Sequence, residues 1–224
     1  MKTLAKTLAA ASIAAATVAG APAAAQVSGI AVSSPEAVFL RSAARQAAYT
    51  QIAQTYAGQI QQINTMRQEA QTLQQSLDTN GDGQVTDAEA AANQGVTTQV
   101  QQKLQQIAQT GQPITLAQTY VVEQLLLDYN NAQQQVISSK GIQLMLPADG
   151  VQYVSDAADV TSDILAVLDQ RLPTVQAAPP ANWRPRRESL ALQQSIQQIL
   201  AGLAQQQAAQ AAQQGAAAQQ PTGR

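Results

Sequence analysis

A long run of apolar side chains spaced three and four residues apart constrains this chain more than any other feature of its sequence. The run consists of Tyr49, Ile52, Tyr56, Ile63, Met66, Ala70, Leu73 and Leu77. This spacing places its members on one stripe of an α-helix, and a stripe of about four heptads is typical of a coiled-coil seam. We therefore expect an arm helix over residues 36–77, about 60 Å long at 1.5 Å per residue.

The chain is expected to turn back at the end of this arm. Residues 78–83 read Asp-Thr-Asn-Gly-Asp-Gly, a cluster that cannot continue a helix. A second stripe with the same spacing consists of Val100, Leu104, Ile107, Ile114, Val121 and Leu125. It predicts a return helix over residues 86–140 that packs antiparallel to the arm. Because proline removes a backbone donor and clashes with the preceding turn, we expect a kink or short break, able to act as a hinge, at Gly111-Gln112-Pro113.

Short β-prone segments flank this hairpin. Residues 27–33 predict one strand, and residues 142–154 predict two more, joined by a turn at residues 147–150. A helix over residues 161–172 follows. The expected fold class is mainly α with a small β-body, from which a long antiparallel helical hairpin projects. So small a sheet buries too little surface to stand alone, so we expect the strands to assemble in an oligomer.

Both ends of the chain have a distinct composition. Residues 1–25 combine two lysines, a short apolar run and a final Ala-Ala-Ala, which predicts a cleaved secretory signal peptide. Residues 176–188 predict a Pro/Ala/Arg linker, residues 189–206 an amphipathic helix and residues 207–224 a disordered Ala/Gln tail. The linker contains a cluster of one aromatic and three basic residues, Trp183, Arg184, Arg186 and Arg187. This cluster could make a weak contact with an anionic membrane surface, or it could be a solvated linker.

The composition excludes most catalytic chemistry. The chain has no Cys and no His, so it offers no thiolate or imidazole for a metal site or a nucleophile. Only 3% of its residues are aromatic, whereas 41 are Gln. The formal net charge of −2 lacks the basic face that nucleic acid would require. We therefore expect neither an enzyme nor a nucleic-acid-binding protein.

Four short segments are distinctive in this order of elements. They are Gly29-Ile30-Ala31-Val32, residues 140–147 (Lys-Gly-Ile-Gln-Leu-Met-Leu-Pro), residues 151–155 (Val-Gln-Tyr-Val-Ser) and residues 159–168 (Asp-Val-Thr-Ser-Asp-Ile-Leu-Ala-Val-Leu). With the order of elements, they resemble the Skp/OmpH family of periplasmic chaperones. The resemblance implies a domain over residues 26–175 and a homotrimer whose strands form one β-body with three projecting tentacles. It also implies an ATP-independent holdase that keeps unfolded outer-membrane β-barrel proteins from aggregating in the periplasm. Tentacles of the family are commonly basic, whereas residues 26–175 here hold six basic and thirteen acidic side chains.

Residues 78–89 carry the one motif with metal chemistry. They match the twelve-residue EF-hand loop, with the candidate calcium ligands Asp78, Asn80, Asp82, Gln84, Thr86 and Glu89. Calcium prefers such hard oxygen donors, and a glycine at position 83 permits the sharp bend of the loop. The alternative is a polar hairpin turn in which Thr86 and Glu89 form a capping box for the return helix. The two interpretations are compatible, and a single loop of this kind predicts weak calcium binding, either structural or regulatory.

A second function from a different class fits the same sequence. A calcium-stabilised structural or adhesive coiled-coil protein of the envelope would also need long arms and a Gln-rich tail. The two hypotheses differ in one observable, because only a holdase should suppress the aggregation of a denatured β-barrel protein.

Overall fold

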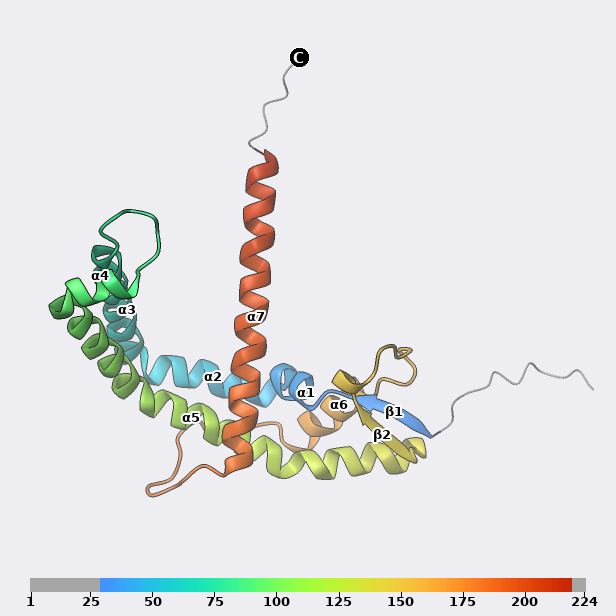
Figure 1. Cartoon of the computed structure of the whole chain (residues 1–224). Coiled ribbons are helices and arrows are strands. Elements are labelled where there is room, and N and C mark those ends of the chain that lie inside the picture. Colours follow the sequence, from blue (N-terminus) through green and yellow to red (C-terminus); the bar gives the residue numbers. More distant parts are fainter. Residues whose placement is uncertain (1–28, 219–224) are drawn as a thin grey trace, which may run out of the picture.

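The computed structural model describes residues 29–218, and most of them are helical. In chain order the elements are β1 (Ile30–Ser33), α1 (Pro35–Arg41), α2 (Ala43–Thr55), α3 (Ala57–Leu77), α4 (Asp87–Ala92), α5 (Gln94–Lys140), β2 (Leu144–Pro147), the 3₁₀ helix η1 (Ala148–Gly150), α6 (Thr161–Arg171) and α7 (Arg187–Ala218). Figure 1 shows a curved helical hairpin with the sheet at one end and the tip at the other, while α7 stands across its middle. The expected fold class is confirmed. The predicted signal peptide lies outside the described residues.

The sheet consists of β1 and β2, which pair in parallel from Ile30 opposite Leu144 to Ser33 opposite Pro147. On the other side of β1, the Val32 N–H donates to the Ala158 carbonyl and the Val32 carbonyl accepts from the Val160 N–H. Both sides of β1 are therefore occupied within the chain.

The prediction of a second strand within residues 142–154 is wrong. Residues 151–154 are not a strand, because η1 redirects the chain after β2 and these residues pair with neither β1 nor β2. The periodic pattern of Val151-Gln152-Tyr153-Val154 was compatible with a strand, but a strand also needs a partner edge.

The outgoing arm consists of three helices instead of the single helix expected over residues 36–77. The first break lies at Ser42, whose hydroxyl accepts a hydrogen bond from the Arg45 N–H and donates one to Asp169. Ser42 is therefore the N-cap of α2, and this cap is tied to α6. The second break lies at Tyr56, where the backbone leaves the helical region and α3 begins one residue later.

The return arm is one 47-residue helix, α5, preceded by the short helix α4. The return helix expected over residues 86–140 is thus divided at Asn93 and not at Pro113, which lies inside α5. A proline costs a helix one hydrogen bond, and here the neighbouring turn is packed, since Ile63 of α3 lies against Gly111 and Ile114 is partly buried. Of the two expected outcomes, the short break is therefore wrong, whereas a kink at Pro113 stays a prediction; α5 curves along its length (Figure 1).

The core lies where α1, α2, α5 and α6 meet, at the base of the hairpin. Phe39, Leu125, Ile164 and Leu168 are fully buried there, and the Phe39 ring lies 5.1 Å from the ring of Tyr129. Each such side chain contributes roughly 1.5–3 kcal/mol on burial. The arm beyond this core has a thinner seam of buried side chains, which are Ile63, Met66, Ala70, Leu77 and Val100.

The C-terminal region is more ordered than expected. The helix predicted over residues 189–206 extends from Arg187 to Ala218, so the expectation of a disordered tail is wrong for residues 207–218. Ala and Gln are good helix formers, so a helix that begins on the hairpin can continue past it. Residues 219–224 lie outside the described residues. None of the helices within residues 29–218 is both long and apolar enough to cross a lipid bilayer.

Candidate functional site

The hairpin tip is a loop closed by hydrogen bonds to its own carboxylates. Asp78 follows α3 directly, and its Oδ1 accepts hydrogen bonds from the Gly81 and Asp82 N–H groups. Its Oδ2 accepts a third from the Gly83 N–H at 2.8 Å. Gly81 and Gly83 have positive φ angles of 76° and 82°, a conformation that glycine adopts at little cost. Asp78 therefore shapes the tight first half of the loop.

The middle of the loop is fixed by three more of the predicted ligands. The Asn80 side chain accepts from the Asp82 N–H and donates to Asp82 Oδ2, while Asp82 Oδ1 accepts from the Gln84 N–H. These three residues are exposed.

Glu89, in the first turn of α4, joins the two ends of the loop. Its Oε1 accepts from the N–H and hydroxyl of Thr79 and from the Asn80 N–H, at 2.9, 3.0 and 3.3 Å. Its Oε2 accepts from the N–H and hydroxyl of Thr86 at 2.9 and 2.8 Å. The Thr86 hydroxyl in turn accepts from the Glu89 N–H, which completes the capping box. The capping alternative is therefore present.

These hydrogen bonds shift the acidity of Glu89. The Thr86 N–H and then the Thr86 hydroxyl, together with the two Thr79 donors and against the opposing effect of burial, lower the pKa of Glu89 from 4.5 to about 2. The carboxylate is therefore ionised at neutral pH and holds the loop closed as an anion.

The predicted calcium ligands have the right chemistry for calcium, but their positions in the loop suit the ion less well. All six predicted ligands offer oxygen donors, and three of them are carboxylates. Within residues 29–218, however, no three acidic side chains gather closely enough to hold a metal ion. Both oxygens of Glu89 already accept hydrogen bonds, so ion binding would compete with the closure of the loop.

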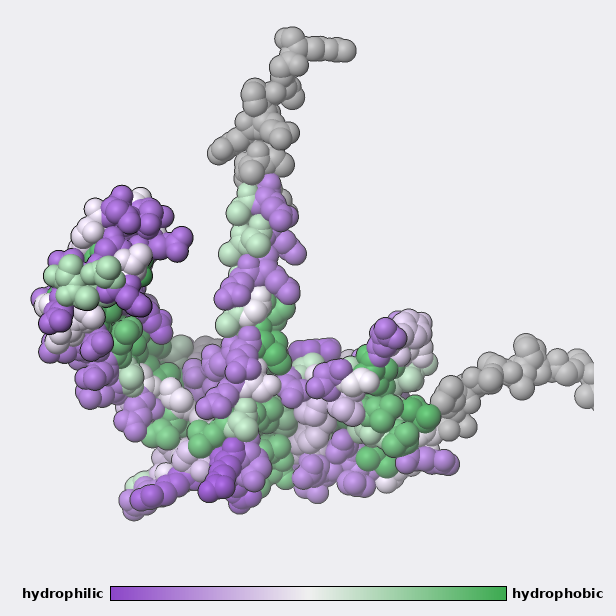
Figure 2. Space-filling model, viewed as in Figure 1, coloured by the Kyte–Doolittle hydropathy of each residue, from purple (hydrophilic) through white to green (hydrophobic). Residues whose placement is uncertain are grey.

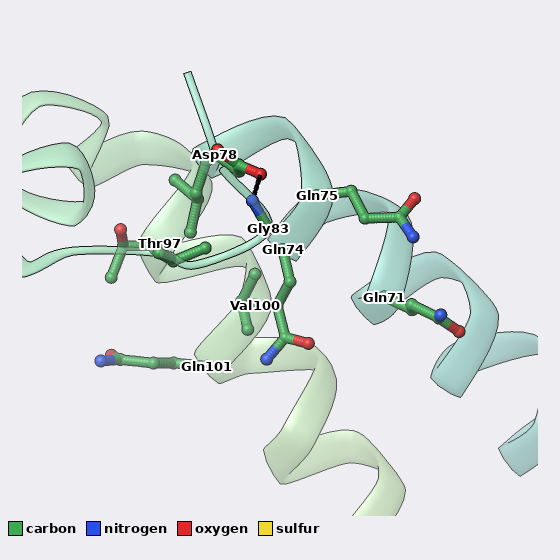
Figure 3. Close-up of a pocket in the computed structure, with 10 residues that line it drawn as sticks. Gln71, Gln74, Gln75, Asp78, Gly83, Thr97, Val100 and Gln101 are labelled. Carbon is green, nitrogen blue, oxygen red and sulfur yellow. Dashed lines mark hydrogen bonds between the residues drawn. The ribbon is translucent and has the colours of Figure 1, made fainter. Parts of the chain in front are cut away.

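A groove of about 600 Å³ lies below the loop, between α3 and α5. Figure 3 shows Gln71, Gln74 and Gln75 on the α3 side and Thr97, Val100 and Gln101 on the α5 side. The lining of the groove combines amide side chains with the apolar side chains of Leu77, Val85 and Val100. Such a surface offers both hydrogen-bond donors and acceptors to a bound chain.

A second polar cluster, which the sequence analysis missed, lies at Glu123 on α5. This carboxylate is 7% exposed and accepts hydrogen bonds from Trp183 Nε1, the Arg186 N–H and the Ser189 hydroxyl, at 3.1, 3.0 and 2.9 Å. Burial is the largest single influence and raises its pKa, but the donors, led by the Arg186 N–H, together hold the pKa below the ordinary value. In the sequence, the one indication of this cluster is that Glu123 is a single acidic residue within the apolar run around Val121 and Leu125.

The linker over residues 176–188 is therefore packed on α5. Gln124 exchanges two hydrogen bonds with the Gln176 backbone, and the Trp183 ring lies edge-on to Tyr120 at 5.0 Å. Trp183 is half-buried, so the solvated-linker interpretation is wrong for it. Arg184 and Arg187 are exposed, and their contact with a membrane stays a prediction.

The fold and the tip together define a protein with a long helical hairpin on a small parallel sheet. The model of the family "Outer membrane protein (OmpH-like)" matches residues 29–168, which is more than half of the chain. The chain belongs to this family, and the recognition of Skp/OmpH is confirmed. The match stops before α7 and its linker.

Two further comparisons are weaker. A crystal structure of an OmpH-like protein from Caulobacter crescentus CB15 is 19% identical and superposes with a TM-score of 0.43, over 72% of this chain and 92% of that one. Among curated proteins, none matches the chain significantly.

Proposed function

We propose that the protein is an ATP-independent holdase chaperone of the periplasm that binds unfolded outer-membrane β-barrel proteins. Membership of the OmpH-like family, which is a chaperone family, is the observation that carries this proposal. The hairpin would be the part that contacts clients, since it projects away from the core at the base (Figure 1).

The surface of the hairpin supports weak, adaptable contacts. Several large apolar side chains are left exposed along it, including Val85, Leu104 and Leu127. Leu104 stands among Gln residues at positions 101, 102, 105 and 106, whose side chains form hydrogen bonds without a fixed charge. Binding surfaces that accept many partners commonly combine flexible apolar and polar groups in this way. Because these apolar and amide side chains carry no charge, we expect client capture to depend only weakly on salt.

We also propose that the protein is a homotrimer assembled through its sheet. Ile30, Leu144 and Tyr153 are exposed at this end of the molecule, and Tyr153 has 83% of its surface accessible. Figure 2 shows apolar residues gathered over β1 and β2. Apolar groups beside a short sheet are typical of surfaces that a partner covers.

A light-scattering assay tests the holdase function. A denatured outer-membrane β-barrel protein is diluted out of urea into buffer with or without the mature protein. Suppression of aggregation at near-stoichiometric amounts is the expected result. The absence of suppression at any ratio would favour the structural coiled-coil alternative.

For the hairpin tip we propose weak calcium binding by the loop over residues 78–89, with Asp78, Asn80, Asp82, Gln84, Thr86 and Glu89 as the ligands. The set of oxygen donors supports this proposal, and the competing hydrogen bonds of Glu89 are the physical reason to expect low affinity. An affinity of about 10⁻⁴–10⁻³ M is common for extracellular calcium modules.

Calorimetric titration of calcium into the wild type and into Glu89→Gln tests whether the loop binds calcium. We expect the wild type to release or absorb heat on binding calcium and the variant to show no such heat. We also expect calcium to raise the melting temperature of the wild type but not that of the variant. Equal behaviour of both proteins in calcium and in chelator would exclude the site. Running the aggregation assay under both conditions separates a structural from a regulatory ion.

A further inference from the structure

The first turns of α7 form an interface with the hairpin. Ser189 and Ile196 are fully buried, and Gln193 is nearly so. The Tyr49 hydroxyl of α2 donates to Gln193 Oε1 at 3.0 Å. Together with the hydrogen bonds to Glu123, these contacts fix the foot of α7 on the arm.

The apolar side of α7 continues after the helix leaves the hairpin. Ile199, Leu200 and Leu203 follow Ile196 at three, four and seven residues, so they share its side of the helix. They are 38, 39 and 47% exposed. We call these three residues the α7 stripe. It extends an established interface into the part of α7 that projects away from the hairpin (Figure 1).

We propose that the α7 stripe binds an extended, apolar and uncharged segment of an unfolded client polypeptide. This inference rests on the proposed holdase function and deepens it, because it assigns client contact to a helix that lies outside the family match at residues 29–168. The family region alone would not contain this surface.

A second copy of the chain is a poorer occupant, because the stripe is too short. The positions that would continue it along the helix are Gln206, Gln207 and Gln210. Stable helix pairing needs an apolar seam over at least about three heptads, and a stable protein interface buries about 800 Å² on each partner. Three half-exposed side chains suit a weak contact with a flexible chain instead.

The charge of the helix favours an uncharged client segment. After Glu188, α7 contains no charged residue as far as Ala218. An apolar client segment would therefore desolvate no ionic group when it covers the stripe. Transmembrane β-strands alternate apolar and polar residues over about ten positions. An extended, unfolded strand therefore presents one apolar side that could cover the stripe.

The test compares two double variants of the full chain. Ile199→Glu with Leu203→Glu places two charges in the stripe. The matched control, Ala201→Glu with Gln205→Glu, adds the same charges at the same spacing on the exposed opposite side of α7. The probe is a fluorescently labelled, urea-diluted outer-membrane β-barrel protein, and its Kd is measured by anisotropy. Sedimentation and circular dichroism of the free proteins report their oligomeric state and helicity.

We expect the stripe variant to bind the client about tenfold more weakly, and the control to bind like the wild type, with the oligomeric state unchanged in both. Equal client binding by both variants would overturn the inference, and so would dissociation of the oligomer in the stripe variant alone, which would assign the stripe to a second copy. A wild type that binds no client instead refutes the proposed function itself.

A photocrosslinking measurement keeps the inference testable if the charged variant misfolds. Benzoylphenylalanine replaces Leu203 in one protein and Gln205 in another. Client crosslinks from position 203 that exceed those from position 205 support the inference, and equal yields overturn it.

Discussion

At the scale of single residues, two carboxylates organise the parts of the molecule that connect helices. Glu89 closes the tip loop and caps α4, and Glu123 holds the linker and the foot of α7. Each carboxylate accepts several N–H or O–H donors from a neighbouring segment, and charged hydrogen bonds of this kind are stronger than neutral ones.

The lowered pKa of Glu89 predicts a pH dependence of stability. The pKa of Glu89 is about 2 in the folded protein, compared with 4.5 ordinarily. Its ionised carboxylate therefore contributes fully to the free energy of unfolding above about pH 4.5, and this contribution is lost as pH falls toward 2. We expect the melting temperature of the wild type to fall further between pH 5 and pH 3 than that of Glu89→Gln. Other acids titrate in both proteins, so the difference isolates Glu89. Parallel curves would contradict this role.

The chain has one tryptophan, which makes the Glu123 cluster directly observable. In Glu123→Ala, the Trp183 N–H and the Ser189 hydroxyl lose their acceptor, and the side chain of Trp183 is expected to become more exposed. We predict a red shift of its fluorescence and faster proteolysis within the linker. Glu69→Gln, which changes an exposed acid of the arm, is the control. Unchanged emission in Glu123→Ala would show that the cluster does not hold α7.

At the scale of elements, periodicity predicted the hairpin well and its interruptions poorly. The stripes along residues 49–77 and 100–125 lie on α2, α3 and α5 as expected. The breaks lie at Ser42, Tyr56 and Asn93, whereas the proline at position 113 is accommodated within α5. The sequence contains the capping residue Ser42, but its partner Asp169 comes from a distant helix. Local patterns therefore predicted the helices, and long-range contacts decided where they begin and end.

Burial along α5 predicts very different costs for two similar substitutions. Leu125 is fully buried in the core, while Leu104 on the same helix is 50% exposed. Leu125→Ala is expected to lower the free energy of unfolding by about 2–5 kcal/mol, and Leu104→Ala by less than about 0.5 kcal/mol. Urea denaturation followed by circular dichroism measures both values. Similar losses would mean that the arm is covered in the assembled protein.

At the scale of the whole molecule, the base and the arms have different tasks. The core at the base is packed by four helices, and α6 is held there by a two-bond ion pair between Arg171 and Asp128. The arm has only a thin seam, so it exposes much of its surface. A stable base with sparsely packed arms is the arrangement that the proposed holdase requires.

The exposed apolar residues beside the sheet lead us to predict that the proposed oligomer assembles through them. Ile30→Lys together with Leu144→Lys places two like charges at this surface. We expect the proposed trimer to dissociate, because burying unpaired charges costs more than the apolar contacts contribute. Sedimentation velocity measures the change. Leu190→Lys, an exposed apolar position on α7, should leave the oligomer intact. A trimer that survives the double substitution would place the interface elsewhere.

The sequence by itself determined the helices of the hairpin, the capping motif at its tip and the family, because helix periodicity, the capping box and each of the family's segments are patterns of residues close together in the chain. Only the tertiary structure decided that residues 151–154 are not a strand and that Glu123 anchors the C-terminal region. These features depend on partners far apart in sequence, such as Glu123 and Ser189 or β1 and residues 158–160. Periodicity describes which face of a segment is apolar, but it carries no information about which distant segment will cover that face.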